Sequence, residues 1–477
     1  MPTPSPIGAN TVIHTNATIR TSILQQAWPI LISQWAGVSF AVLDTMMLGN
    51  HSPESLQTMS LAASIFITVN ISLTGVIHAL IPIFSQLIGS KKYHQVGELW
   101  GQGIWLGMLL ALIAGLLLLF PNLWLSISGD VPEHVRQQVA TYLRIVYFSM
   151  PAALMFRAIY SICTSAQRPK HVMYISVTGI FIKAALNWVL IFGYFGLPAL
   201  GSTGAGISTT VVSWLMFAFG LWVLFSDPYY QKFKLSLGRP QWRHFSEILK
   251  LGIPMGGSYF VEVSAFTFMA LLAAREGTHV SGAHQIMANL AAVLYMMPMS
   301  FGIATSSLAA QAIGARNLLI SHRIIKIGFM IMLCGALLSS LLVFFGKHTI
   351  IGFYTSDTQV ALMAASLLTI APFFHILDSY QCMNTYVLRA HKIATIPFLI
   401  QTFMLTGIGL GGGFYFGYGP GQGALSWISQ IVTPGDATGV SSLWIMCCIA
   451  LTLCGIILHF WYRKIIYKPL IAPLLRT

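Results

Sequence analysis

The sequence predicts an all-α integral membrane protein in which twelve transmembrane helices form two pseudo-symmetric six-helix lobes around a central cleft. The first observation is composition: hydrophobic residues make up 56% of the 477 residues and charged residues only 8%, with a mean hydropathy of +0.75. A soluble protein has roughly a quarter of its residues charged, so this chain must be solvated by lipid. The other two observations are apolar runs along the whole chain and an internal repeat.

The apolar runs are long enough to cross a membrane. A helix of about 20 apolar residues spans the hydrocarbon core of a bilayer, which is about 30 Å thick. The predicted spans lie at residues 22–48, 58–86, 97–120, 138–164, 170–194, 204–226, 246–274, 282–309, 322–346, 359–387, 393–417 and 441–465.

The charged residues of the loops predict the topology. Most of the 25 Lys and Arg residues fall in loops on the same side as the termini, whereas the opposite loops are richer in carboxylates. Positively charged loops stay in the cytoplasm, so both termini are expected there. The net charge of +13 then reflects membrane topology, and no nucleic-acid partner is expected.

Residues of the first half recur in the second half at a nearly constant spacing. Pro29 and Pro254 are 254 − 29 = 225 positions apart, and Pro151 and Pro372 are 372 − 151 = 221 positions apart. Six spans per half would make the halves parallel repeats, and rocking of such halves would open a central cleft to each side in turn. The predicted parts are an N-lobe, a cytoplasmic linker and a C-lobe, at residues 1–226, 227–245 and 246–477.

Three carboxylates lie well inside predicted spans, Asp44, Glu262 and Asp378, together with the basic residues Arg157 and Lys183. A charge at the bilayer centre costs about 2.5–3.5 kcal/mol on insertion scales, so such residues usually serve a function. One interpretation is a structural salt bridge, which suits Asp44 and Lys183 best. The second half is expected to offer no buried base, so Glu262 and Asp378 would need a proton or a metal ion such as Na⁺ between them.

Other polar residues of the second half could complete this ion site. Gln285 and Asn289 are four positions apart and share a helix face, and Tyr295 and Gln381 are further candidates. Buried amides more often join helices than bind ligands, and both interpretations stay open. The histidines inside spans, each either a proton relay or a hydrogen-bonded core residue, are His78, His284 and His375.

No enzyme motif or nucleotide-binding motif is present in the sequence. We therefore expect no enzymatic activity and no cofactor, and an ion gradient as the energy source. The six cysteines lie in or beside apolar runs without metal-ligand spacing, and we expect them to pack as small core residues without disulfides.

Several motifs occur in the order typical of one transporter family. They are P-x4-Q-x9-D-T-x-M-x-G through Pro29, Gln34, Asp44 and Gly49, the segment Asn187 to Gly196, Gly282-Ala283-His284-Gln285, Val293 to Pro298, and D-x-x-Q at Asp378 and Gln381. From about Trp28 to about Phe460, the chain resembles the multidrug and toxic compound extrusion (MATE) transporters of the NorM subgroup.

The resemblance implies a secondary active antiporter that exports organic cations in exchange for Na⁺ or H⁺. It places the second-lobe cation site, with Na⁺ as its metal if sodium is the coupling ion, at Glu262 and Asp378, and a coupling acid of the first lobe at Asp44. We expect a multi-pass protein of the bacterial inner membrane that acts as a monomer. The candidate supporting or substrate contacts are Gln34, Lys183, Asn187, Gln285, Asn289, Tyr295 and Gln381.

Two positions depart from the family pattern. Lys183 stands where the family often has an asparagine, and an ammonium group facing Asp44 would occupy the first-lobe site. Phe374 stands where the family often has a tyrosine, which removes an oxygen from the second-lobe site unless His375 replaces it. Two rival functions are a lipid-linked oligosaccharide or polysaccharide flippase of the same superfamily, and a non-transporting membrane receptor or enzyme.

Overall fold

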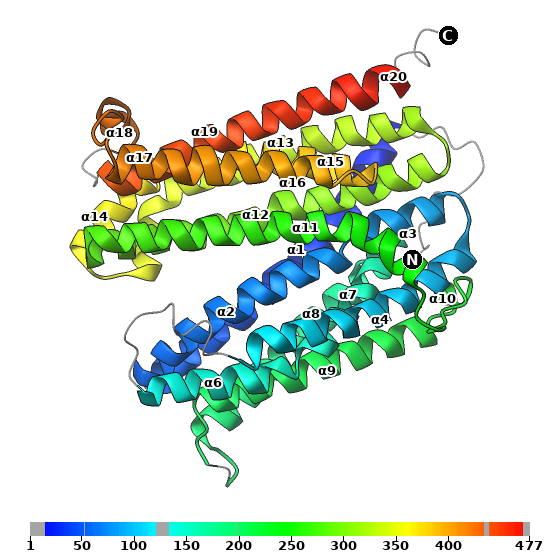
Figure 1. The fold of residues 1–477 in the computed structure, drawn as a ribbon, viewed down its shortest axis with the longest axis horizontal. Coiled ribbons are helices and arrows are strands. Elements are labelled where there is room, and N and C mark those ends of the chain that lie inside the picture. The colour runs from blue at the N-terminus through cyan, green and yellow to red at the C-terminus, as the bar shows by residue number, and fades with distance from the viewer. Residues whose placement is uncertain (1–14, 52, 121–132, 197, 434–437, 471–477) are drawn as a thin grey trace. The chain divides into compact units, whose positions relative to one another are not determined.

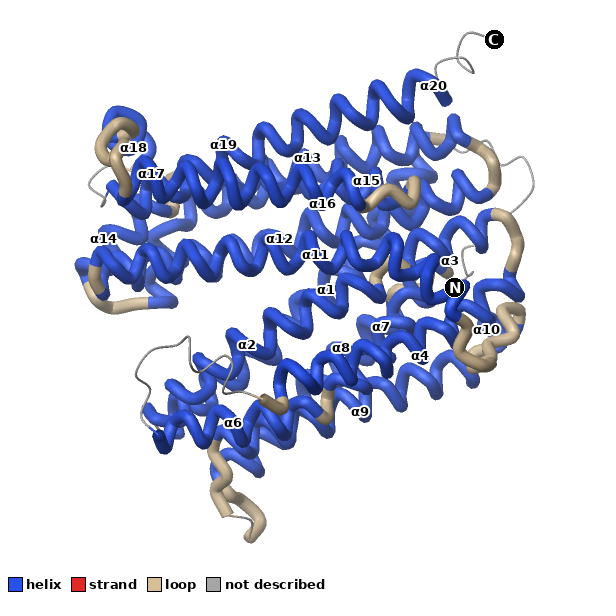
Figure 2. The backbone as a smooth tube through the Cα atoms, viewed as in Figure 1, coloured by secondary structure: helices blue, strands red, loops and turns tan. Residues whose placement is uncertain are grey.

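The computed structural model describes residues 15–51, 53–120, 133–196, 198–433 and 438–470, and the regular structure of these residues is entirely helical (Figure 2). The chain divides into two compact units. Of the described residues, unit 1 comprises those of 28–256, and unit 2 comprises those of 15–27 and 257–470.

The twelve predicted spans are confirmed as helices of the right length. Within the described residues, ten helical segments are long and apolar enough to cross a membrane, and two helix pairs bent by 43° and 46° bring the number to twelve if each pair counts as one span. The bends precede Pro151 and Pro372, which are aligned by the repeat, and each proline occupies the first turn of the second helix of its pair. Proline lacks the amide that a continuous helix would need there, so both units bend at the same place in the repeat.

The helices of unit 1 surround a core of buried aliphatic and aromatic side chains, among them Trp100, Tyr142 and Tyr160. The helices, labelled in Figure 1, are α1 (Asn16–His51, from Trp28 onward), α2 (Pro53–Ile77), α3 (Leu80–Gly89), α4 (Tyr93–Leu118), α6 (Glu133–Tyr147), α7 (Met150–Ser165), α8 (Lys170–Phe192), α9 (Ser202–Ser226), α10 (Pro228–Gln231) and the first part of α11 (Trp242–Ala273).

Unit 2 contains a second core, in which Trp444 and Phe374 are fully or almost fully buried. Its helices are the first part of α1 (residues 16–27), the rest of α11, η1 (Ala274–Glu276), α12 (Thr278–Gly314), α13 (Leu318–Tyr354), α14 (Thr358–Leu367), α15 (Ala371–Ala390), α16 (Thr395–Thr402), the π-helical η2 (Phe403–Gly411), α17 (Gly412–Tyr418), α18 (Ser426–Val432), α19 (Thr438–Trp461), η3 (Tyr462–Tyr467) and α20 (Lys468–Leu470). Figure 1 shows α12, α13, α15 and α19 running alongside one another, and neighbouring members of this group are in contact.

The division between the units falls inside two helices. It lies between Ala27 and Trp28 in α1 and between Gly256 and Gly257 in α11. Each break lies within three residues of the aligned prolines Pro29 and Pro254, which are inside these helices. The division at a separate linker, predicted for residues 227–245, stays a prediction.

Residues 232–241 are bound tightly to α4. A Cβ atom built on Gly97 would lie 2.0 Å from the carbonyl oxygen of Phe233, and one on Gly101 would lie 2.1 Å from that of Ser236. Gln102 donates to the carbonyl of Arg239 at 2.8 Å and accepts from a linker amide at 2.8 Å. Only glycine allows so close an approach of two backbones, so this linker forms part of unit 1.

Candidate functional site

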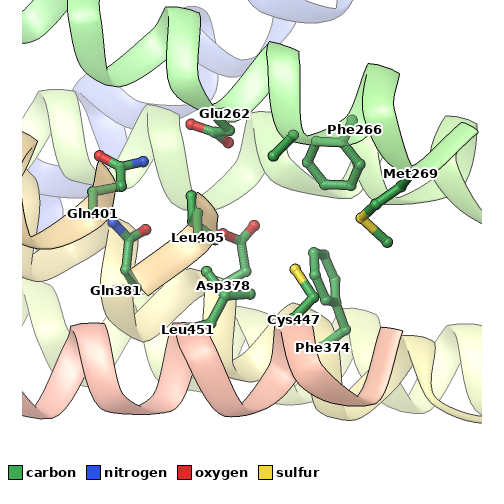
Figure 3. A pocket seen from close by; sticks show the side chains of 11 residues that line it. Glu262, Phe266, Met269, Phe374, Asp378, Gln381, Gln401, Leu405, Cys447 and Leu451 are labelled. Atoms are coloured by element: carbon green, nitrogen blue, oxygen red, sulfur yellow. The ribbon is translucent and has the colours of Figure 1, made fainter. Parts of the chain in front are cut away.

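A small cavity with four polar residues in a largely apolar lining lies inside unit 2 among α11, α15, α16, η2 and α19. Its polar lining consists of Glu262, Asp378, Gln381 and Gln401, and Figure 3 shows these side chains around one common space. The rest of the lining is formed by Ala265, Phe266, Met269, Phe374, Leu405, Cys447 and Leu451. The cavity has a volume of about 20 Å³, which suits one water-sized occupant.

Glu262 enters this cavity from the middle of α11. Its carboxylate accepts a hydrogen bond from the hydroxyl of Tyr295 on α12 at 3.5 Å and one from the side chain of Gln401 on α16. Two neutral donors from two other helices therefore fix the orientation of this carboxylate without supplying a positive charge.

Gln401 is a site residue that the sequence analysis missed. Its side chain is 4% exposed, and its Oε1 atom is buried without a hydrogen-bond partner among the described residues. It is the second-last residue of α16 and directly precedes the end of that helix, where the π-helical η2 begins. A buried amide oxygen without a donor is costly, and beside two carboxylates it is a ready ligand for a cation.

Asp378 reaches the cavity from α15 and is 6% exposed. Its carboxylate interacts electrostatically with that of Glu262. Among the residues that the structure describes, neither carboxylate has a basic nitrogen within 4.0 Å. Gln381, one turn further along α15, donates to Thr385 at 3.2 Å. Its amide oxygen has the same acceptor chemistry as the other oxygens of the cavity.

The donor set suits a small hard cation. Carboxylate and amide oxygens are the ligands preferred by such ions, and the described residues contain no cluster of three His, Cys, Asp or Glu that would suit a transition metal. A drug-sized ligand needs about 300 Å³ or more. The cavity can therefore hold a proton, a sodium ion or a water molecule, and it is too small for an organic cation.

The expectation that the second half lacks a buried base is wrong. Arg389 lies near the end of α15 and is only 4% exposed. Its Nη1 atom donates to the hydroxyl of Tyr259 at 3.2 Å. Arg389 lies just beyond the predicted span of residues 359–387, so it was not expected among the buried bases.

Unit 1 holds the third carboxylate in a different environment. Asp44 of α1 and Lys183 of α8 form an ion pair at 2.9 Å, with side-chain exposures of 5% and 1%. Asn187, one turn after Lys183, donates to the same Asp44 oxygen at 2.7 Å. The structural salt bridge predicted as one alternative for this pair is confirmed.

Two hydroxyl groups of α9 complete the unit 1 cluster. Lys183 donates to Thr209 at 2.7 Å, and Ser208 donates to the side-chain oxygen Oδ1 of Asn187. Buried charges need such full pairing to be tolerated. The Asp44 carboxylate is thus already neutralised by an ammonium group of the chain itself.

The other predicted residues lie away from the cavity. Gln285 donates to Asn289 at 3.0 Å, which confirms their shared helix face, but both are exposed on α12. Gln34 is partly exposed on α1. His284 accepts from Trp444 at 3.2 Å and is a core residue.

His375 does not replace the oxygen that Phe374 lacks. Its Nε2 atom lies 2.8 Å from the hydroxyl of Ser339 on α13, whereas Phe374 lines the cavity with its ring. The second-unit site therefore relies on two carboxylates and two amides.

Comparison with known proteins identifies the family. The MatE family model matches residues 29–189 and 254–415, which together are more than half of the chain. The chain belongs to the MatE family. The two matches begin at the aligned residues Pro29 and Pro254, so the same family model recognises each half of the repeat.

Curated MatE relatives align along almost the whole chain. The "Probable multidrug resistance protein NorM" of Aromatoleum aromaticum is 31% identical over 455 residues, covering 95% of this chain and 96% of that protein. The protein of the same name from Chromobacterium violaceum is 33% identical, with 93% of each chain covered. The crystal structure of the eukaryotic MATE transporter AtDTX14 superposes with a TM-score of 0.84 at 19% identity, covering 95% and 98% of the two chains, and confirms the MatE fold.

Proposed function

We propose that this MatE protein is a secondary active multidrug efflux antiporter that exports organic cations in exchange for Na⁺ or H⁺. The names of its relatives, multidrug resistance proteins over more than nine-tenths of the chain, support the efflux of drugs. The two-unit helical fold supports transport by alternating access.

One observation carries the ion-coupled mechanism. The carboxylates of Glu262 and Asp378 and the unpartnered oxygen of Gln401 share one ion-sized cavity, and no basic nitrogen lies within 4.0 Å of either carboxylate among the described residues. Buried carboxylates without a direct counter-ion attract a cation. Glu262 and Asp378 are therefore the coupling pair, and Tyr295 and Gln401 orient the first of them.

The small cavity separates the coupling ion from the exported cation. Because it holds only a water-sized occupant, the organic cation must bind elsewhere, and the two ligands compete through the conformation of the protein. An ion that binds one access state more tightly shifts the population toward that state. The ion thereby weakens the binding of the organic cation by some factor, and reciprocity requires that the organic cation weakens the binding of the ion by that same factor.

The test is efflux from proteoliposomes that contain the purified protein. Ethidium serves as the organic cation, and sodium and proton gradients are imposed separately. We expect one of these gradients to drive ethidium transport and its collapse to stop it. Absence of transport with either gradient would refute the proposed function.

Two substitutions test whether the ion that drives efflux binds in unit 2. E262Q and D378N keep the side-chain shape but remove the charge, and each should abolish gradient-driven efflux while the protein still purifies as a folded monomer. E276Q is the matched control, because Glu276 lies in η1 outside the cavity lining. Gradient-driven efflux by the combined E262Q/D378N variant would show that the ion binds elsewhere.

The rival function is a lipid-linked oligosaccharide flippase. Such a cargo is anionic and large, and it would be expected to need a basic cleft, whereas the buried site here is acidic. Flipping of a fluorescent polyprenyl-linked sugar in the same liposomes, without ethidium efflux, would favour the rival. The proposal includes an inner-membrane location, cytoplasmic termini, a monomeric state, and no cofactor or enzymatic step.

A further inference from the structure

A permanent positive charge is buried in unit 2 near the cation site. The guanidinium of Arg389 lies 5.2 Å from the ring centre of Tyr259 and 4.8 Å from that of Tyr386. It donates to the Tyr259 hydroxyl at 3.2 Å, and this hydroxyl lies 2.8 Å from the hydroxyl of Tyr386. An arginine side chain remains protonated in proteins, so this charge is present throughout any transport cycle.

Neutral groups hold this charge. No carboxylate lies within 4.0 Å of Arg389 among the described residues, and its buried Nε atom has no hydrogen-bond partner there. Its partners are the rings of Tyr259 and Tyr386 and the hydroxyl of Tyr259. Aromatic rings attract cations without neutralising them, so the field of the guanidinium extends beyond its contacts.

The positive charge of Arg389 acts on Glu262 through the tyrosines between which it is held. Tyr259 precedes Glu262 by three residues on α11, so the two side chains occupy neighbouring positions on one helix face. Tyr295, which donates to Glu262, also interacts electrostatically with Tyr259 and Tyr386. The electrostatic interaction between Arg389 and Glu262 is itself attractive.

Unit 1 provides the contrast. There the Lys183 ammonium contacts the Asp44 carboxylate directly at 2.9 Å, so the negative and positive charges neutralise each other. Unit 2 has one buried carboxylate, Asp378, one partly buried carboxylate, Glu262, and one buried guanidinium that contacts neither of them. The charges of Glu262, Asp378 and Arg389 sum to −2 + 1 = −1, and the site lacks one positive charge.

We propose that Arg389 is an internal counter-cation of the Glu262–Asp378 site and limits the site to one monovalent cation per cycle. This inference rests on the proposed function. One proton or one sodium ion brings the cavity to neutrality. A second cation would leave an excess positive charge at a buried site, which is costly. Exchange of one such ion for one monovalent organic cation moves no net charge across the membrane.

The test measures how membrane potential affects transport. Proteoliposomes receive a potential from a potassium gradient and valinomycin, and the steady-state accumulation of ethidium is measured under the ion gradient that drives transport. For the unaltered protein we expect the accumulation ratio to be independent of the potential. For R389Q, which removes the charge but keeps a hydrogen-bond donor, we expect two ions per cycle. The accumulation ratio should then change about fiftyfold for each 100 mV of membrane potential. This fold-change corresponds to about 2.3 kcal/mol for moving one elementary charge through 100 mV.

Two further variants separate charge from structure. R389K keeps the charge and should restore transport that is independent of the potential. Y259F removes the hydroxyl that accepts from Arg389 but keeps the guanidinium in the protein, so the ratio of one ion to one organic cation should persist even if the protein is less stable. If R389Q does not fold, potential-independent transport by the unaltered protein and by Y259F still supports the one-ion site.

Two results would overturn the inference. The first is a strong dependence of ethidium accumulation on the potential in the unaltered protein, and the second is an R389Q variant whose accumulation is as independent of the potential as that of the unaltered protein. Failure of the proposed function looks different, because the unaltered protein would then show no gradient-driven efflux at any potential.

Discussion

Removal of the Lys183 ammonium tests whether the chain itself neutralises Asp44. In K183M the Asp44 carboxylate keeps only the hydrogen bond from Asn187 at 2.7 Å, because the ion pair at 2.9 Å is lost. Removing one partner of a buried ion pair costs about 3–5 kcal/mol. D44N should cost about the same, because it leaves the ammonium without a carboxylate.

The double variant D44N/K183M should regain most of this loss. It contains no uncompensated charge, and replacement of both partners of a buried pair is often close to neutral. The free energy of unfolding is measured by SDS-induced unfolding of the purified protein in mixed micelles, for the four members of the double-mutant cycle. We expect an interaction energy of about 3 kcal/mol or more between the two positions, whereas independent positions give less than about 0.5 kcal/mol.

The same variants test whether Asp44 takes part in coupling the ion gradient to efflux. Because Asp44 is already neutralised, D44N/K183M should retain ethidium efflux driven by the ion gradient. The reasoning is refuted if K183M is as stable as the unaltered protein, or if the two single losses simply add. A folded double variant without gradient-driven efflux would show that Asp44 binds the coupling ion.

Three other changes have defined outcomes. Q401L removes the unpartnered oxygen from the cavity, and we expect the concentration of coupling ion needed for half-maximal efflux to rise about tenfold, as for the loss of about 1.4 kcal/mol of ion binding. G101A places a methyl group 2.1 Å from a linker carbonyl oxygen and should destabilise the protein by about 1–3 kcal/mol, whereas G352A, with open space around the new methyl group, should not. D357A should lower thermal stability at pH 7, because the amides of Gln359 and Val360 donate to this carboxylate and hold its pKa below its ordinary value of 3.8. A lowered pKa in the folded state gives a contribution that is present above about pH 4 and is lost as the pH falls further, so the difference should disappear in acid.

A defined result would contradict each of these predictions. An unchanged half-maximal ion concentration in Q401L, with Q401N as the polar control, would remove Gln401 from the site. Equal stability of G101A and G352A would mean that the linker moves freely. A difference between D357A and the unaltered protein that persists undiminished at pH 3 would show that the carboxylate charge is not its source. D357N, which keeps a hydrogen-bond acceptor but has no charge, should lose the pH-dependent part of the stability and match the unaltered protein only in acid.

Features that depend on local pattern could be predicted from the sequence. Hydropathy alone indicates the spans, and the aligned prolines Pro151 and Pro372 mark the positions at which both units bend. The ion pair of Asp44 and Lys183 could be anticipated because the first half holds few buried charges. Glu262 and Asp378 were found in the same way, and the structure brings them to one cavity.

Features that depend on tertiary packing could not be predicted. Arg389 and Arg168 occupy aligned positions at the ends of apolar runs, yet Arg389 is 4% exposed, whereas Arg168 is 33% exposed and pairs with Asp227 at 2.7 Å. The partner tyrosine of Arg389 lies 130 positions away in the chain. Gln401 did carry a signal, as an amide in an apolar run, but Gln285 is also an amide in an apolar run and lies on an exposed face.

The linker of residues 232–241 has a consequence for protein engineering. Segments between repeated halves are the usual places at which a chain is split, permuted or interrupted by a reporter domain, because they are exposed and make few contacts. Here the backbone rests on Gly97 and Gly101 and is hydrogen-bonded by Gln102. An insertion at this segment would damage the first unit directly, so reporters and split sites belong at other loops of the chain.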